Sequence, residues 1–338
     1  MRTYEEALSY LQRYINYELK RTIPYAPGTF DLARMYALLG RLGDPHQAYP
    51  TIHIAGSKGK GSTAAMAASI LQAAGYRTGM YISPHLHTCR ERMQVNGTLI
   101  TPEEFAALVE DIAPHAEAVK GITWFEVTTA LAFLYLARHE VDIAVIEVGL
   151  GGRLDATNVI TPQVSVITSL SYEHTAWLGD TLGQIAREKA GIIKPGVPVV
   201  SAPQADEAMA VIEKVCAERK APLIRVGRDW LFRSGSIHPG GQVFEVRPAS
   251  ATGILPAAWT RFEIPLLGRH QIINATCALA AISALPLERF EIPFRALREG
   301  LATVTWPGRI EVLSRQPLVI ADGAHNEDSA RRLVETLQ

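Results

Sequence analysis

A glycine-rich segment with two lysines is the strongest chemical signal in the sequence. The apolar run 51–55 leads directly into Gly56-Ser57-Lys58-Gly59-Lys60-Gly61-Ser62, where a helical pattern begins. Glycines let the backbone fold around an anion, and the N–H groups at a helix N-terminus supply positive potential. We predict a phosphate-binding loop in which Lys60 reaches the β- and γ-phosphates of a nucleotide. The spacing differs from GxxxxGK[ST], and Gly61 follows Lys60, so a glycine-rich turn with a surface lysine is the alternative interpretation.

A carboxylate ends one of the most apolar runs of the chain. Glu147 follows Val141-Asp142-Ile143-Ala144-Val145-Ile146, and glycines come soon after it. A carboxylate that closes a buried strand is costly to bury without a cation. The carboxyl edge of a parallel sheet is also where such folds bind ligands. The position therefore indicates a cation site beside the phosphate loop.

Lys189 has a purely structural interpretation. Thr181 and Gln184 have the spacing of a capping box that opens a helix, and Gly191 suits a left-handed residue after its end. A lysine in the last turn complements the helix dipole. Taken alone, the pattern favours this capping role.

The elements that would position these groups alternate between strands and helices. Near-continuous Val/Ile runs are typical of parallel strands covered on both faces, and the alternation predicts βαβ units. The predicted strands are Thr51–Ala55, Thr78–Ile82, Val141–Val148, Gln163–Thr168 and Val197–Ser201. The predicted helices are Ser62–Ala74, Pro102–Val119, Val127–Arg138, Thr181–Ala190 and Ala205–Arg219, with an amphipathic helix from Tyr4 to Leu19 before them.

The C-terminal third departs from this alternation. Segment 223–267, rich in Gly, Pro and Arg, predicts a small antiparallel excursion, and a helix is expected over Gln271–Leu285. After the linker-like Trp306-Pro307-Gly308, a strand is expected over Leu318–Ala321 and a helix over Asp328–Leu337. We therefore predict an α/β fold of the P-loop type, with a mostly parallel sheet flanked by helices. Its ATP-binding domain would span residues 1–302, and residues 303–338 would be a linker and the start of a second, incomplete α/β domain.

Composition narrows the function classes. The 338 residues carry 33 Lys+Arg against 34 Asp+Glu, so no basic surface for nucleic acid is expected. Three widely spaced cysteines without a CxxC pair indicate reduced thiols and a cytoplasmic protein. The longest apolar stretch is too short to span a bilayer, so no membrane contact is expected. We expect a monomer.

Together, the motifs resemble those of the folylpolyglutamate synthase/dihydrofolate synthase family of the Mur ligase superfamily. Besides the loop, the matching segments are Ser83-Pro84-His85, Arg90-Glu91-Arg92, 147–158, His174, 188–194, Pro307-Gly308-Arg309 and 322–326. The chain departs from the family at Ser57-Lys58, which replaces Thr-Asn, and at Glu173, which replaces Asp. Asp31 also replaces a frequent glycine near Arg34, in the family's N-terminal substrate segment. Family members continue for about another domain's length, on the order of a hundred residues.

The resemblance implies roles for individual residues. It places Mg²⁺ at Ser83, Glu147, His174 and a carbamylated Lys189, and it implies Lys60, Lys189 and His174 as catalytic residues. It implies ATP contacts by Ser57, Lys58, Gly59, Lys60, Gly61, Ser62, Asn274, Arg309, Asp322 and His325. It implies dihydropteroate contacts by Thr123, Leu154, Asp155 and Ala156.

The implied activity is an ATP-dependent ligase that adds L-glutamate to folate as a tetrahydrofolate polyglutamate synthase. The same resemblance extends it to dihydropteroate, as in a dihydrofolate synthase, through an acyl phosphate. One alternative is a Mur-type ligase on a UDP-sugar peptide, which Gly61 and the Ser83-Pro84-His85 segment disfavour. Another is a non-catalytic nucleotide-binding protein, because the second domain is short. For the same reason we expect the chain as given to bind MgATP weakly and to ligate glutamate poorly.

Overall fold

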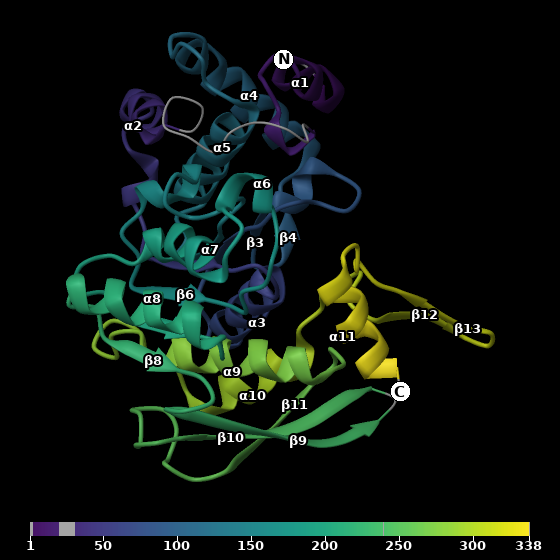
Figure 1. The fold of residues 1–338 in the computed structure, drawn as a ribbon. Coiled ribbons are helices and arrows are strands. Elements are labelled where there is room, and N and C mark those ends of the chain that lie inside the picture. The colour runs from purple at the N-terminus through teal and green to yellow at the C-terminus, as the bar shows by residue number, and fades with distance from the viewer. Residues whose placement is uncertain (1–2, 20–30, 239, 338) are drawn as a thin grey trace.

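An eight-stranded, mostly parallel sheet forms the centre of the molecule (Figure 1). The computed structural model describes residues 3–19, 31–238 and 240–337. The strand order is β4-β3-β2-β5-β1-β6-β7-β8, and only β3 and β4 run antiparallel to their neighbours. The parallel strands are β1 (Thr51–Ala55), β2 (Thr78–Tyr81), β5 (Ile143–Glu147), β6 (Val164–Ile167), β7 (Val199–Ser201) and β8 (Leu223–Arg225). The antiparallel edge consists of β3 (Met93–Val95) and β4 (Thr98–Leu99). The predicted fold class is confirmed.

Helices cover both faces of this sheet because successive strand residues point to opposite sides. Ile52 and Ile54 of β1 pack toward α3 (Lys60–Ala73), α9 (Arg269–Ser283) and α10 (Phe294–Thr303). On the opposite face, Ala144 and Ile146 of β5 pack toward α1 (Tyr4–Leu11), α4 (Pro102–Glu117) and α5 (Trp124–Arg138). Further α-helices before the C-terminal segment are α2 (Leu32–Arg41), α6 (Thr175–Leu178), α7 (Leu182–Lys189) and α8 (Asp206–Glu218). The carboxyl ends of β1 and β5 thus lie between two helical layers.

The antiparallel excursion begins later than the sequence predicts. Strands β9 (Trp230–His238), β10 (Gly241–Pro248) and β11 (Thr260–Ile264) form a separate three-stranded sheet. The segment Leu223–Arg225, predicted as part of the excursion, is instead the parallel edge strand β8 and pairs with β7. Its placement follows helix α8, which returns the chain to the main sheet as in the preceding βαβ units.

The C-terminal segment projects from the body as a hairpin and one helix (Figure 1). The predicted strand is β13 (Leu318–Ala321), which pairs antiparallel with β12 (Glu311–Arg315), a strand that the sequence analysis misses. Helix α11 (Glu327–Leu337) agrees with prediction and has no buried residue. Leu313 and Leu318 of the hairpin are 60% and 65% exposed. The domain boundary after residue 302 stays a prediction.

Two local expectations are wrong. The N-terminal helix ends at Leu11 rather than Leu19, and Ile15 instead pairs with the backbone beside α5, where its carbonyl accepts the Trp124 N–H at 3.0 Å. Gly191 does not adopt a left-handed conformation; it lies in a 3₁₀ turn (Ala190–Ile192), where a Cβ would lie 2.4 Å from Cα of Arg153. In both places a contact with a distant segment overrides the local pattern. Helices α2 and α10 were not predicted.

Candidate active site

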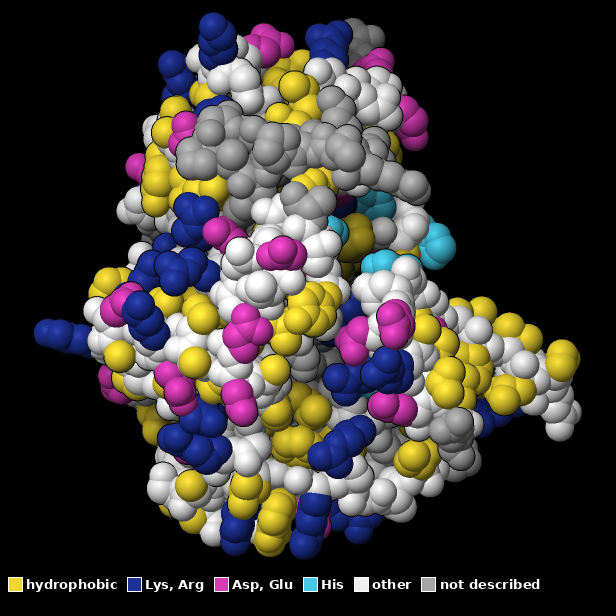
Figure 2. Space-filling view, in the orientation of Figure 1, with side chains coloured by type: hydrophobic (Ala, Val, Ile, Leu, Met, Phe, Trp, Pro, Cys, Tyr) yellow, Lys and Arg dark blue, Asp and Glu magenta, His cyan; other side chains and the backbone are white. Residues whose placement is uncertain are grey.

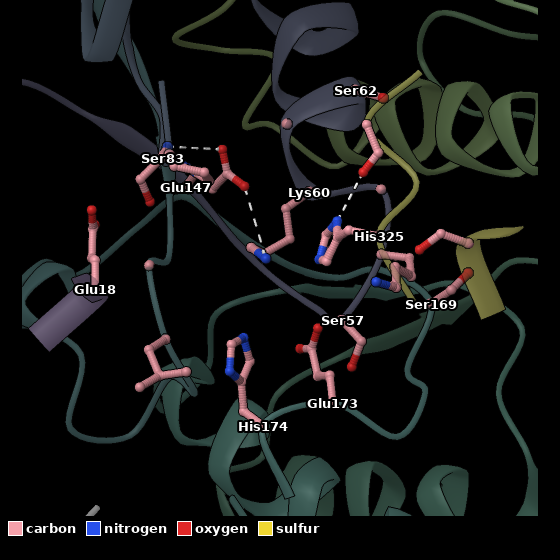
Figure 3. Close-up of a pocket in the computed structure, with 18 of the residues that line it drawn as sticks. Glu18, Ser57, Lys60, Ser62, Ser83, Glu147, Ser169, Glu173, His174 and His325 are labelled. Carbon is pink, nitrogen blue, oxygen red and sulfur yellow. Dashed lines mark hydrogen bonds and ion pairs between the residues drawn. The ribbon is translucent and has the colours of Figure 1, made fainter. Parts of the chain in front are cut away.

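The predicted site residues converge on one cavity of about 490 Å³. Figure 2 shows a hollow on this face of the molecule with histidine side chains around it. The lining includes every residue implied by the resemblance except Lys189: Ser57, Lys58, Gly59, Lys60, Gly61, Ser62, Ser83, Thr123, Glu147, Leu154, Asp155, Ala156, His174, Asn274, Arg309, Asp322 and His325. Segments more than two hundred residues apart in sequence therefore meet at one place (Figure 3).

The phosphate-loop segment connects β1 to α3 with its early N–H groups already satisfied. The N–H groups of Ser57 and Lys58 both donate to the Ser169 carbonyl at 3.0 Å. Gly59 then adopts a left-handed conformation at φ 86°, and a Cβ there would lie 2.2 Å from Oδ1 of Asn274. The first N–H groups of α3 have no acceptor within the helix. They and the Lys60 side chain are the groups that this loop offers to an anion.

Gly61 leaves room for the linker to approach the loop. A Cβ at this position would lie 2.6 Å from Cζ2 of Trp306 and 3.4 Å from Oε2 of Glu147. The residue that departs from the usual phosphate loop is therefore a close-packing position. The hydroxyl that standard loops carry there has no space in this structure.

Glu147 is the best-defined acidic group of the cavity. It is 4% exposed, its Oε2 accepts the Ser83 N–H at 3.3 Å, and its Oε1 lies 3.9 Å from Nζ of Lys60 (Figure 3). Burial raises the pKa of Glu147 to about 6, although Lys60 acts in the opposite direction. Removal from water thus outweighs the attraction of the lysine, which is the situation expected of a carboxylate that a cation would stabilise.

Lys189 lies beneath the loop rather than in the cavity. It is 2% exposed, and its Nζ donates to the Gly56 carbonyl at 2.9 Å and to Oε1 of Glu173 at 2.8 Å. Burial lowers the pKa of Lys189, and Glu173 acts in the opposite direction. The sequence-based interpretation as a dipole-complementing lysine omits this burial. The capping box of Thr181 and Gln184 itself is confirmed.

The opposite wall contains Glu173 and His174. Glu173 lines the cavity, and its pairing with Lys189 was not predicted. His174 precedes α6 with φ 47° and stacks on Trp177 with ring centroids 5.6 Å apart. Among the described residues, no three His, Cys, Asp or Glu side chains are grouped so as to hold a metal by themselves. Any cation here would need oxygen atoms from a ligand or from water in addition to the protein.

The residues that the resemblance assigns to dihydropteroate form another part of the cavity wall. Thr123 caps α5 in a capping box with Glu126, whose carboxylate is held by Nε of Arg34 at 3.0 Å. Asp155 is 4% exposed and accepts the N–H groups of Leu150 and Thr157, which shapes the loop after β5. The lining also contains Tyr17, Glu18, Leu32, Phe125 and Glu126, which sequence reasoning missed. The capping-box spacing of Thr123 and Glu126 was an available signal for Glu126 alone.

The C-terminal segment contributes the last wall. Asp322 accepts the N–H groups of Ile310 and Ala324 at 2.9 and 2.7 Å, so it organises the hairpin base. Arg309 donates to the Gly308 carbonyl at 2.8 Å. His270 and Arg332 also line the cavity and were not predicted; burial lowers the pKa of His270 to about 4, and Arg332 acts in the same direction.

The chain is similar to proteins of a known family. The model of the Mur ligase middle domain matches residues 54–282. The chain is 39% identical to the dihydrofolate synthase/folylpolyglutamate synthase of Bacillus subtilis, with 99% of this chain and 76% of that protein covered. It is 40% identical to a probable bifunctional folylpolyglutamate synthase/dihydropteroate synthase of Halobacterium salinarum; 99% of this chain is covered, but only 39% of that protein.

Solved structures are similar over nearly the whole chain. An FPGS–AMPPCP–folate complex is 34% identical with a TM-score of 0.88, and the match covers 99% of this chain and 80% of that one. The folylpolyglutamate synthase of Thermotoga maritima is 37% identical with a TM-score of 0.84, over 99% of this chain and 74% of that one.

Proposed function

Because this chain belongs to the folylpolyglutamate synthase/dihydrofolate synthase family of the Mur ligase superfamily, we propose that it is an ATP-dependent ligase that joins L-glutamate to a folate and to dihydropteroate. One observation carries the proposal. A single cavity joins a lysine-bearing loop at a helix N-terminus to a partly apolar wall that contains Phe125, Leu154 and Ala156. A nucleotide and a flat, partly apolar acceptor can therefore meet there.

The phosphate end would hold ATP. Lys60 and the free N–H groups at the start of α3 supply positive potential, and Lys58 and Arg309 add two cationic side chains to the same wall. Asn274, Asp322 and His325 lie around this end and would contact the nucleotide. The complexes of similar FPGS structures with AMPPCP support this placement.

The residues present fit Mg²⁺ in part. Magnesium prefers oxygen ligands and keeps several waters, so one or two carboxylates plus phosphate oxygens suffice. The buried Glu147, with its raised pKa, meets that requirement, and the Ser83 hydroxyl and His174 lie in the same cavity. When bound, the ion would neutralise phosphate charge. Glu147 would be its main protein ligand, with Ser83 and His174 beside it.

The chemistry then follows from positioning. The acceptor carboxylate attacks the γ-phosphorus, the bond to the β-phosphate oxygen breaks, and an acyl phosphate and ADP result. The α-amine of L-glutamate attacks the acyl carbon, phosphate leaves, and the amine loses a proton as the amide forms. Lys60 would hold the transferred phosphoryl group while Thr123, Leu154, Asp155 and Ala156 hold the acceptor.

Lys189 would contribute as a carbamate. Its neutral Nζ would bond to the carbon of CO₂ and release a proton, which produces a carboxylate beneath the loop. Burial and a lowered pKa support the reaction, because only the neutral amine reacts. The Nζ–Glu173 pair opposes it and would have to open.

Two separate measurements test the ligase proposal. AMPPCP binding would be measured by calorimetry, and ADP release would be measured with dihydropteroate or tetrahydrofolate, each with and without L-glutamate. We expect binding, and ADP release that requires both acceptor and glutamate. Binding without turnover on any acceptor would favour a nucleotide-binding protein, and turnover on a UDP-sugar peptide would favour a Mur-type ligase.

The proposal also covers the partners, oligomeric state and cellular compartment of the protein. We expect small-molecule partners, no nucleic acid and a cytoplasmic monomer. Cys89, Cys216 and Cys277 are buried and unpaired, which supports a reducing compartment. Over the described ranges, no helix has the length and apolarity to cross a membrane.

A further inference from the structure

Arg92 is a buried cation that none of the roles above uses. It ends the 3₁₀ helix Cys89–Arg92, is 1% exposed, and is the bulkiest fully buried side chain among the described residues. A guanidinium stays charged at any ordinary pH, so burying one is costly unless its donors are paired. The free-energy cost of burying Arg92 therefore depends on which groups accept its hydrogen bonds.

These partners come from three separate segments. Nη1 and Nη2 donate to the two carboxylate oxygens of Glu18 at 2.9 and 2.7 Å, which is a forked ion pair. Nε donates to Nδ1 of His85 at 2.9 Å, and the guanidinium carbon lies 4.8 Å from the ring centroid of Trp124. We name Glu18, His85, Arg92 and Trp124 the Arg92 cluster.

Each of the three segments also forms part of the cavity wall. Tyr17 and Glu18 line it from the N-terminal segment, Ser83 and Pro84 from the loop after β2, and Thr123 and Phe125 from the start of α5. Figure 3 shows Glu18 and Ser83 reaching the cavity from different elements. One buried side chain thus joins three segments of the cavity wall, among them the start of α5 with Thr123, and none of these segments is the phosphate loop.

The neighbouring Glu91 completes the loop. Its carboxylate accepts the N–H groups of Leu86, His87 and Thr88 at 2.7 to 2.8 Å. Glu91 organises the backbone of the loop, and Arg92 attaches the loop to the other two segments. These two adjacent charged residues therefore act on the same wall in different ways.

We propose that Arg92 is a positioning residue for the acceptor substrate: through Glu18, His85 and Trp124 it holds together the wall that binds the pterin-containing acceptor. This inference rests on the proposed function for the identity of the acceptor. Arg92 itself does not touch substrate. Its loss would weaken acceptor binding more than binding of AMPPCP without Mg²⁺, because the phosphate loop and the C-terminal segment at the nucleotide end contain none of the three partners of Arg92.

Binding measurements on purified variants test the selectivity. Arg92→Met, Arg92→Lys, Glu18→Gln and the Arg92→Met/Glu18→Gln double variant would be compared for dihydropteroate and for AMPPCP without Mg²⁺. We expect tenfold or greater weakening of dihydropteroate binding in Arg92→Met, less in Arg92→Lys, and AMPPCP binding within twofold of wild type. The double variant should be no weaker than the weaker single variant, because the two residues form one unit. Arg138→Met is the matched control, since Arg138 pairs with Asp111 while both side chains are 49% exposed.

Hydrogen exchange without any ligand tests the cluster independently of the substrate. Arg92→Met or, if it does not fold, Arg92→Lys should accelerate exchange in residues 15–19, 83–88 and 123–125, with residues 56–62 unchanged. Unaltered exchange in those three segments, or equal loss of AMPPCP and dihydropteroate binding, would overturn the inference. A wild-type protein that binds neither dihydropteroate nor tetrahydrofolate would contradict the proposed function instead, and the exchange pattern would still decide the role of Arg92.

Discussion

Nζ of Lys60 lies 3.9 Å from Oε1 of Glu147, and both side chains line the same cavity. The pair brings the cation of the phosphate loop to the carboxylate that ends β5. It is too long for a hydrogen bond, so neither group satisfies the other fully. Each remains available to a ligand of opposite charge.

Replacing Lys60 should remove activity and leave the fold intact. Lys60→Ala is expected to lower ATP-dependent ligation by at least about a hundredfold, because the loop loses its phosphate-contacting cation. Circular dichroism and the melting temperature should stay close to wild type. Lys214→Ala is the control, since Lys214 is 68% exposed on α8. Unchanged turnover of the folded Lys60→Ala protein would contradict the phosphate-loop assignment.

Removing the charge of Glu147 should abolish activity without lowering the free energy of unfolding. Glu147→Gln keeps an acceptor for the Ser83 N–H but no longer buries a carboxylate at 4% exposure. We expect unfolding free energy in EDTA equal to or above that of wild type, with loss of Mg²⁺-dependent ADP release. Urea denaturation and a magnesium titration of turnover measure the two effects. Glu103→Gln on the exposed start of α4 should change neither. A marked loss of stability would show that the carboxylate is structural.

Restoring the usual hydroxyl after the loop lysine should be harmful. In Gly61→Ser the new Cβ would lie 2.6 Å from the Trp306 ring, so Trp306 or the loop must move. Overpacking of this kind costs about 1–3 kcal/mol. A lower melting temperature and weaker AMPPCP binding are expected. Gly40→Ala is the contrast, because a Cβ at this position would meet no atom within 4 Å beyond its chain neighbours and the backbone of its own helix, so α2 should be stabilised. A Gly61→Ser protein as stable and as tight for AMPPCP as wild type would refute this.

Shortening Glu173 should favour carbamylation of Lys189. The Glu173 carboxylate holds Nζ at 2.8 Å and keeps the pKa of Lys189 higher than burial alone would. Glu173→Asp loosens the pair, so more of the amine is neutral and able to react with CO₂. ¹³C NMR in labelled bicarbonate should show a stronger carbamate signal in Glu173→Asp and none in Lys189→Ala. A signal that persists in Lys189→Ala would belong to another lysine.

His270 should contribute to acid sensitivity. Burial lowers its pKa from 6.5 to about 4, so the unfolded state takes up this proton at higher pH than the folded state. Stability is therefore lost as pH falls from 6.5 toward 4, by up to about 3 kcal/mol. His270→Gln removes this component, and its unfolding free energy should fall less over that range. Urea denaturation at pH 7, 5.5 and 4 measures it; parallel curves for the two proteins would contradict the role of His270.

The sequence alone determined the five parallel strands β1, β2, β5, β6 and β7 of the central sheet and the loop that follows β1, but not β3, β4 and β8. Strand β1 agrees with prediction residue for residue, and the loop at residues 56–62 has the predicted strand–turn–helix context. These features depend on local information: strand periodicity, glycine positions and helix starts are set by neighbours in the chain. The resemblance then identified groups as distant as Lys60, Asn274 and His325, which line one cavity.

Tertiary contacts decided what local patterns could not. The N-terminal helix stops at Leu11, as the chain turns to pair Ile15 with the start of α5. Lys189 has the sequence context of an exposed capping residue, yet it is 2% exposed beneath the loop. Arg92 pairs with Glu18 and with His85, which lie 74 and 7 residues away from it in the sequence. Burial and long-range pairing depend on which segments pack together, and a side chain's own neighbours in sequence carry little information about that.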